Sequence, residues 1–240
     1  MYSQSPQEVS ASRAEAAFHP RSAPFIFACL ITLAVGVALW GAAAHYPAFQ
    51  DALHEDGPVE KVSAVLWGLC AVMVLYFVGG TALRTQWQLS ALFFLLCGRE
   101  LDFDKRFLSE GILQLRLYSG GAPLWEKVIG IAIIAMVLLV VWRLLRVNLP
   151  LLLKGLRQLS LWSWGGALAV SAIVVAKGVD GIGRKFADFG VILDPTLIAR
   201  ALVYEELLEL FAAAIVAWSI CHFEGQRRRA RGGRSMACCS

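Results

Sequence analysis

Six apolar stretches of about 20 residues each recur along this 240-residue chain. A helix needs about 20 predominantly apolar residues to cross the hydrocarbon core of a bilayer. Only 17% of the residues are charged, whereas soluble domains carry about 25%. The pattern therefore predicts an all-α fold, a polytopic membrane helix bundle with about six transmembrane helices. We place these spans at about 25–44, 60–80, 86–104, 125–146, 160–179 and 198–222.

The segments that flank the spans divide the chain into three regions. Residues 1–23 form a flexible tail, residues 24–222 a transmembrane domain, and residues 223–240 a basic tail. Basic residues gather between 143 and 157 and in the run RRRARGGR at 227–234. Loops rich in Lys and Arg remain in the cytoplasm. We therefore expect both tails to be cytoplasmic and the protein to be a multi-pass protein of the cell inner membrane.

Two stretches between spans mix apolar residues with charged ones. They are HYPAFQDALHEDG at 45–57 and DKRFLSEGILQLRLYSGG at 104–121. Such sequences are typical of helices that lie in the membrane interface. We predict short amphipathic segments on the outer face, with an ordinary loop as the alternative at 104–121.

The last predicted span carries Glu205, Glu206 and Glu209 in its first half. On a helix these three side chains occupy an arc of about 100°. The same arc continues as Ala212 and Ala213, and small residues let neighbouring helices approach closely. We therefore expect the carboxylates to point into the bundle, in the outer half of the membrane.

The third and fifth spans also carry charged residues of both signs, at about the same membrane depth as the three glutamates. Arg99 and Glu100 follow only about ten apolar residues, so the third span must carry them into the outer part of the membrane. Lys177 and Asp180 end the fifth span and share a helix face at i, i+3. We expect Glu205 to face these cations across the bundle, together with Glu209.

Two further carboxylates open spans at this level, Glu60 in the second span and Glu126 in the fourth. A charge near the bilayer centre costs about 2.5–3.5 kcal/mol, so buried charges persist where they pair or line a wet cavity. Intramembrane ionisable residues are therefore candidates for a functional site. The predicted binding residues are Glu60, Arg99, Glu100, Lys177, Asp180, Glu205, Glu206 and Glu209, and no catalytic residue is assigned.

Clustered carboxylates suit several functions. They bind cations and, because like charges repel, they also hold protons. We predict a polar pocket that opens to the outer face and binds or moves a cation, a proton or a small cationic solute. One alternative is a membrane-embedded enzyme that uses a glutamate as acid or base on a lipid-linked or amphipathic substrate. Another is an accessory membrane subunit whose salt-bridge network is purely structural.

Other kinds of site lack their sequence signatures. The histidines form no HExxH pattern, and the cysteines lack the spacing of a metal site. We expect no metal and no cofactor. The net charge is only +4, and we interpret the arginine run as a topology anchor rather than a nucleic-acid contact. The expected partners are membrane lipids and the cation or proton itself. The four histidines are His19, His45, His54 and His222.

Overall fold

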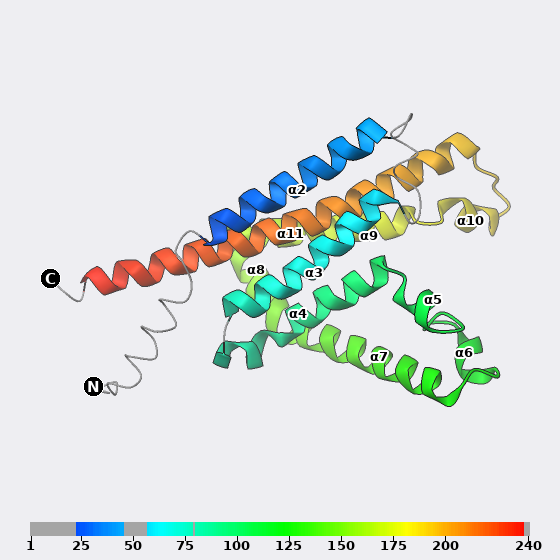
Figure 1. The fold of residues 1–240 in the computed structure, drawn as a ribbon, viewed down its shortest axis with the longest axis horizontal. Helices are drawn as coiled ribbons and strands as arrows, with labels where there is room; N and C mark the ends of the chain where they lie inside the picture. The colour runs from blue at the N-terminus through cyan, green and yellow to red at the C-terminus, as the bar shows by residue number, and fades with distance from the viewer. Residues whose placement is uncertain (1–22, 46–56, 79, 238–240) are drawn as a thin grey trace.

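The computed structural model describes residues 23–45, 57–78 and 80–237, and every regular element in these ranges is a helix. The fold is therefore an all-α bundle, as the apolar stretches predict (Figure 1). The predicted outer segment at 45–57 lies, apart from its two end residues, outside the described residues. The elements are α2 (Ala23–His45), α3 (Pro58–Val78), α4 (Gly80–Glu100), α5 (Phe103–Phe107), α6 (Leu115–Ser119), α7 (Leu124–Arg143), a π-helical turn η2 (Leu144–Asn148), α8 (Leu149–Arg157), α9 (Leu161–Val179), α10 (Ile182–Ala187) and α11 (Pro195–Ala237).

Five helices in the described ranges are long and apolar enough to cross a membrane, which is the organisation of a multi-pass membrane protein. They match five of the six predicted spans. The span predicted at 86–104 corresponds to α4, which is 21 residues long but is not among the five. Polar residues near both of its ends, including Gln88 and Arg99, leave only a short apolar run between them. The five are Ala23–Gly41, Pro58–Val78, Leu124–Arg157, Leu161–Val179 and Pro195–Arg228.

Helix α11 is much longer than the predicted span at 198–222. Its 43 residues correspond to about 65 Å at the usual rise of an α-helix. The helix continues into the basic tail because Glu224 pairs with Arg227 and Arg228, three and four residues further on, at 2.8 and 2.7 Å. The sequence therefore changes from apolar to basic near residue 222, but the helix continues through this position.

The first turn of α11 is fixed by its sequence. Pro195 suits this position because its missing N–H is one that a helix start leaves unpaired. The Asp194 Oδ1 atom accepts hydrogen bonds from the Thr196 hydroxyl at 2.6 Å and from the Thr196 backbone N–H at 2.7 Å. These bonds lower the pKa of the exposed Asp194 carboxyl below its usual value. The helix start is thus held by an aspartate that stays ionised.

Helices α7 and α8 form one continuous rod through the π-helical turn η2. The predicted span at 125–146 ended inside this turn. Pro150 accounts for the widening, because it has no N–H to donate and its ring clashes with the carbonyl of the preceding turn. The turn places Asn148 against α4, where Gln88 Nε2 donates to Asn148 Oδ1 at 2.8 Å. Asn148 Nδ2 in turn donates to Gln86 Oε1 at 3.0 Å. These hydrogen bonds between amide side chains join the α7–α8 rod to α4.

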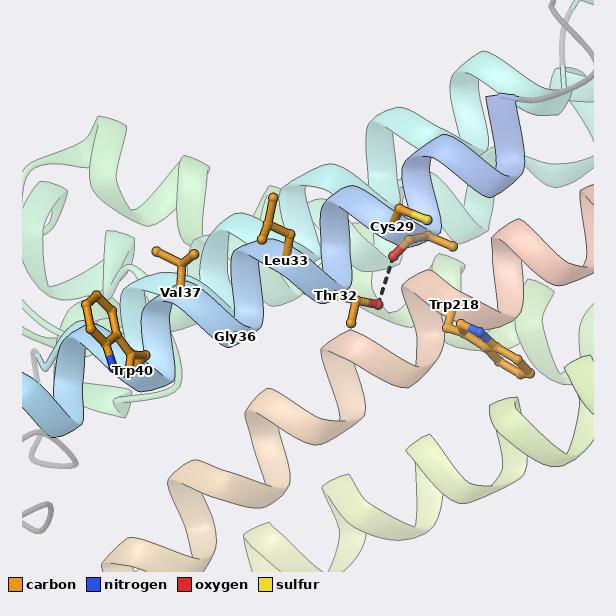
Figure 2. Close-up of a pocket in the computed structure, with 8 residues that line it drawn as sticks. Cys29, Thr32, Leu33, Gly36, Val37, Trp40 and Trp218 are labelled. Carbon is orange, nitrogen blue, oxygen red and sulfur yellow. Dashed lines mark hydrogen bonds between the residues drawn. The ribbon is translucent and has the colours of Figure 1, made fainter.

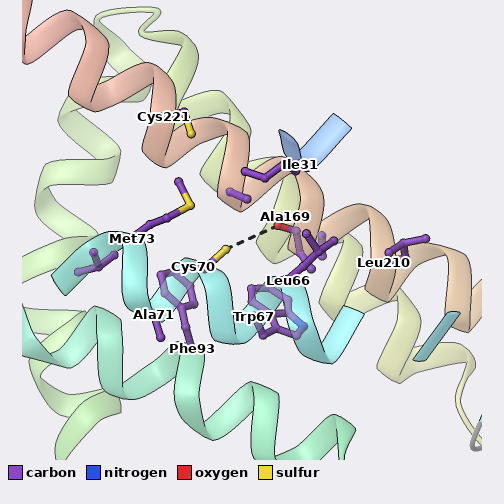
Figure 3. Close-up of a cluster of buried hydrophobic side chains, with 14 of the residues drawn as sticks. Ile31, Leu66, Trp67, Cys70, Ala71, Met73, Phe93, Ala169, Leu210 and Cys221 are labelled. Carbon is purple, nitrogen blue, oxygen red and sulfur yellow. Dashed lines mark hydrogen bonds between the residues drawn. The ribbon is translucent and has the colours of Figure 1, made fainter. Parts of the chain in front are cut away.

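The apolar core lies where α3, α4 and α11 meet, and Ile31 of α2 and Ala169 of α9 also belong to it (Figure 3). Trp67 of α3 stacks on Phe93 of α4 with ring centroids 5.8 Å apart. Cys70 is fully buried, and its thiol donates to the Ala213 carbonyl of α11 at 3.9 Å. Helix α11 also packs against α9 and α2. Small residues on α11 therefore let three neighbouring helices approach it closely.

The chain direction brings three helix ends together on one stretch of α11. Helices α3 and α4 form an antiparallel pair, so the start of α3 lies beside the end of α4 (Figure 1). Helices α9 and α11 form a second such pair, and the end of α9 lies beside Glu205 and Glu209, about three to four turns after the start of α11. Because α3 also packs on α11, the three ends meet around this stretch of α11.

Candidate functional site

Glu209 of α11 is the centre of an ionic cluster where these three helix ends meet α11. Its Oε1 atom lies 2.6 Å from Lys177 Nζ of α9 and 3.2 Å from Arg99 Nη2 of α4. The side chain of Glu209 is only 7% exposed, whereas those of Lys177 and Arg99 are 32% and 47% exposed. Two cations from different helices thus reach inward from the surface to one buried carboxylate.

Lys177 connects Glu209 to two more carboxylates. Its Nζ atom lies 3.0 Å from Glu205 Oε1, one helical turn before Glu209 on α11. It also lies 3.6 Å from Asp180 Oδ2, three residues further along the chain. The ammonium group therefore contacts three carboxylates, and Asp180, which is 44% exposed, forms the outer edge of the cluster.

Glu100 and Glu60 extend the cluster to α3. Glu100 is buried, with its Oε1 atom 3.5 Å from Arg99 Nη1. The Ser63 hydroxyl of α3 lies 3.4 Å from Glu100 Oε2 and donates to the Glu60 backbone carbonyl at 2.8 Å. The half-buried Glu60 opens α3 one turn before Ser63. The structure thus places all eight sequence-predicted residues around one junction.

Glu206 differs from the other carboxylates of the cluster. It is only 7% exposed, and it forms no hydrogen bond or ion pair with a residue that the structure describes. Its electrostatic neighbours are the carboxyls of Glu60, Glu100, Glu205 and Glu209. Glu206 therefore interacts chiefly with the acidic groups of the cluster.

The sequence of α11 explains why its glutamates face inward. Ala212, Ala213 and Ala217 are fully buried and continue the face that carries Glu206 and Glu209. The large residues Tyr204, Phe211 and Trp218 are 62%, 43% and 42% exposed. The helix therefore packs along its small residues and presents its large ones outward, and this rotation buries the carboxylates.

Glu126 does not join the cluster, although the sequence places it at the same level. It is buried at the start of α7, where its Oε2 atom accepts from the Ser109 hydroxyl at 2.5 Å and the Ser109 N–H at 3.0 Å. Lys127 donates to the Gly120 carbonyl at 2.9 Å. Glu126 thus holds the α5–α6 connection against the start of α7, and Lys127 holds the residue that follows α6. Helix α7 packs on α4 and α6 but lies apart from the cluster.

Sequence reasoning missed a second buried carboxylate network at the opposite end of α11. Glu224 is 3% exposed, and its partner Arg227 also donates to the Phe77 carbonyl of α3 at 2.8 Å. The guanidinium of Arg228 lies 5.5 Å from the centre of the Phe77 ring. The spacing of Glu224 and the arginines at i, i+3 and i, i+4 is the signal that could have revealed it.

The cluster differs from a metal centre and from the apolar hollow beside α2. Within the described residues, no group of three or more His, Cys, Asp or Glu side chains is arranged to hold a metal ion. The hollow has a volume of about 640 Å³ and lies between Thr32 and Trp40 of α2 and Trp218 of α11 (Figure 2). Its described lining carries no charged side chain. Its described lining is mostly apolar.

A polar hollow of about 330 Å³ lies on the connection between α5 and α7. Glu110 and Arg116 line it and form an ion pair at 3.3 Å. Their side chains are 28% and 81% exposed. An exposed ion pair of this kind contributes little free energy, so the buried carboxylates remain the stronger candidate site.

Comparison of the chain with protein-family models, with curated proteins and with solved structures gives no match, so the cluster itself is the guide to function.

Proposed function

We propose that this is an inner-membrane protein whose carboxylate cluster binds or moves a proton or a small cation from the outer face. The observation that carries the proposal is an imbalance of charge. Among the described residues at the junction of α3, α4, α9 and α11, Arg99 and Lys177 pair with the carboxyl groups of Glu100, Asp180, Glu205 and Glu209, and Glu206 lies beside them without such a pair. The Lys185 ammonium adds a third cation at the end of α9, where it donates to the Lys177 carbonyl at 3.0 Å. With all of these groups ionised, five negative charges face three positive ones, and bound protons or cations would offset the excess of two.

The distribution of exposure supports access from one side. Arg99 and Asp180 form the partly exposed edge, and Glu206 and Glu209 lie behind them. A cation that arrives from water would first meet Asp180 and then the buried carboxylates. Such a gradation from exposed to buried acidic groups is typical of sites that attract and desolvate cations.

A purely structural network would have a different composition. The Glu224 network at the other end of α11 has one buried carboxylate and two arginines at 2.7 and 2.8 Å. That network has enough cations for its carboxylate, and we assign it a structural role. It supplies a control on the same helix for every experiment on the outer cluster.

The function is tested with the protein in lipid vesicles. An imposed pH or cation difference across the membrane should decay faster with the wild-type protein than in empty vesicles, as followed by dyes enclosed in the vesicles. Glu209→Gln should remove this acceleration, because it breaks both cation contacts and lowers the charge of the cluster. Glu224→Gln is the matched control and should retain it.

A protein that binds without transport gives a different result in the same material. The thermal unfolding midpoint in detergent should rise with the concentration of the bound cation or with acidification, because a ligand that binds only the folded state stabilises it. If neither the decay rate nor this ligand dependence differs between wild type and Glu209→Gln, the cluster is structural and the proposal is wrong.

The proposed orientation counts α4 as a sixth crossing beside the five long apolar helices, because an even number of crossings places both termini in the cytoplasm, with the cluster at the outer face. It rests on the basic residues at 143–157 and 227–234. Reporter fusions after Arg84, Arg157 and Arg234 should all give a cytoplasmic signal. A fusion after Gly120, in the outer connection, is the control and should give the opposite signal. A periplasmic signal at Arg234 would reverse the orientation.

A further inference from the structure

Glu206 is surrounded by carboxyl groups on three helices. On its own helix, α11, it interacts with Glu205 and Glu209, and across the junction it interacts with Glu60 of α3 and Glu100 of α4. It is more than nine-tenths buried. This acidic side chain therefore has little access to bulk water and interacts electrostatically with other acidic side chains.

The two cations of the cluster are already engaged with other carboxylates. Lys177 contacts Glu209 at 2.6 Å and Glu205 at 3.0 Å. Arg99 contacts Glu209 at 3.2 Å and Glu100 at 3.5 Å. Glu100 has a further contact with the Ser63 hydroxyl. Glu206 receives no comparable contact from a residue that the structure describes.

An ionised Glu206 would therefore be both desolvated and surrounded by like charge. An isolated charge that leaves water for a low-dielectric interior costs several kcal/mol even after relaxation. Buried carboxyl groups avoid this cost by binding a proton. A metal ion is a poorer solution here, because the described residues offer no group of three ligands arranged to hold one.

Building on the proposed function, we infer that the ligand of the cluster is a proton and that Glu206 carries it. A hydronium ion on the outer face loses a proton and becomes water, and the proton forms an O–H bond with the Glu206 carboxylate. The same bond breaks when the proton leaves, and no electron is transferred. Glu209, Lys177 and Arg99 position the cluster and remain ionised throughout.

Infrared difference spectroscopy tests this inference, because a protonated carboxyl group has a C=O absorption that a carboxylate lacks. We expect such a band in the wild-type protein near neutral pH, shifted in D₂O and lost when the outside is made strongly alkaline. Glu206→Gln should remove the band. This substitution resembles the neutral acid in shape and charge, so the variant should fold like the wild type.

Glu224→Gln, also at a buried glutamate of α11, is the matched control and should leave the band unchanged. The inference is wrong if the wild-type protein has no protonated carboxyl band near neutral pH, and this result does not depend on any variant folding. It is equally wrong if the band persists in folded Glu206→Gln or does not respond to D₂O and external pH.

The vesicle assay separates failure of this inference from failure of the proposed function. If wild-type vesicles dissipate a gradient of Na⁺ or K⁺ and Glu206→Gln vesicles do so equally well, the proposed function holds and the proton inference fails. If neither proton nor cation movement nor binding is detected in the wild type, the proposed function itself fails. The inference predicts that proton movement is lost in Glu206→Gln and retained in Glu224→Gln.

Discussion

Replacing Lys177 with methionine should lower the free energy of unfolding by about 3–5 kcal/mol, the cost of removing one partner from a buried ion pair. The amine of Lys177 lies 2.6 Å from Glu209 and 3.0 Å from Glu205, whose side chains are 7% and 12% exposed. Methionine keeps most of the side-chain volume but leaves both carboxylates without this cation. The measurement is the unfolding transition in mixed detergent micelles.

Replacing the acidic partner, Glu209, should lower the free energy of unfolding by less. Glu209→Gln leaves Lys177 and Arg99 without their shared carboxylate, but both cations are about a third or more exposed and keep contacts with Glu205 and Glu100. The expected loss is about 1.5–3 kcal/mol, the range for hydrogen bonds to charged groups. The loss for Glu209→Gln is smaller than that for Lys177→Met because the carboxylates are more deeply buried than the cations.

The double variant completes a thermodynamic cycle. Lys177→Met combined with Glu209→Gln should be more stable than the sum of the single losses predicts, because the two residues interact directly. Strict additivity would show that the 2.6 Å contact contributes no interaction free energy. Arg116→Met, at the exposed ion pair with Glu110, is the control and should change stability by less than about 1 kcal/mol.

Introducing a large side chain at Gly165 should separate α9 from α11. A Cβ atom at Gly165 would clash with the Ser219 hydroxyl oxygen and lie 3.4 Å from Ser219 Cβ. The buried Ser219 hydroxyl donates to the Ile215 carbonyl at 2.7 Å, so even a small displacement breaks this bond. Gly165→Leu should therefore destabilise the protein by about 1–3 kcal/mol or more through overpacking.

Gly36 provides the matched control for this substitution. A Cβ atom there would meet no heavy atom within 4 Å. Gly36→Leu adds the same side chain and the same gain in helix propensity, about 1 kcal/mol, without a clash. Unfolding of the two variants in the same detergent compares them directly. Equal stability of the two variants would contradict the close packing of α9 on α11.

Much of the bundle could be predicted because membrane spans obey a simple length rule. Five spans were recovered as long apolar helices, and the rotation of α11 followed from the small residues at 212 and 213. The position of Lys177 near the glutamates also followed from length alone, because both had to lie near the same membrane surface. These predictions needed no knowledge of how helices are ordered around the bundle.

The remaining features depend on tertiary arrangement. Glu126 and Glu60 look alike in sequence, since each opens a span, but α7 lies outside the junction and α3 within it. The hydrogen bond between Gln88 and Asn148 joins residues 60 positions apart, which no local pattern reveals. The choice of partner for each glutamate likewise depends on side-chain conformations, and these are set by neighbours on other helices.

The distance between the charged residues at the two ends of the bundle has a consequence for the surrounding lipid. Arg84 and Arg99 are 15 residues apart on α4, and Glu209 and Glu224 are 15 residues apart on α11. These separations correspond to about 22 Å along a helix axis, and helix tilt shortens them further. A typical hydrocarbon core is about 30 Å thick. In a bilayer of this thickness we expect local thinning, or water beside the glutamates, around α4 and α11. Acyl-chain length would then control the hydration of the ionic cluster, and thinner membranes would accommodate the molecule at lower cost.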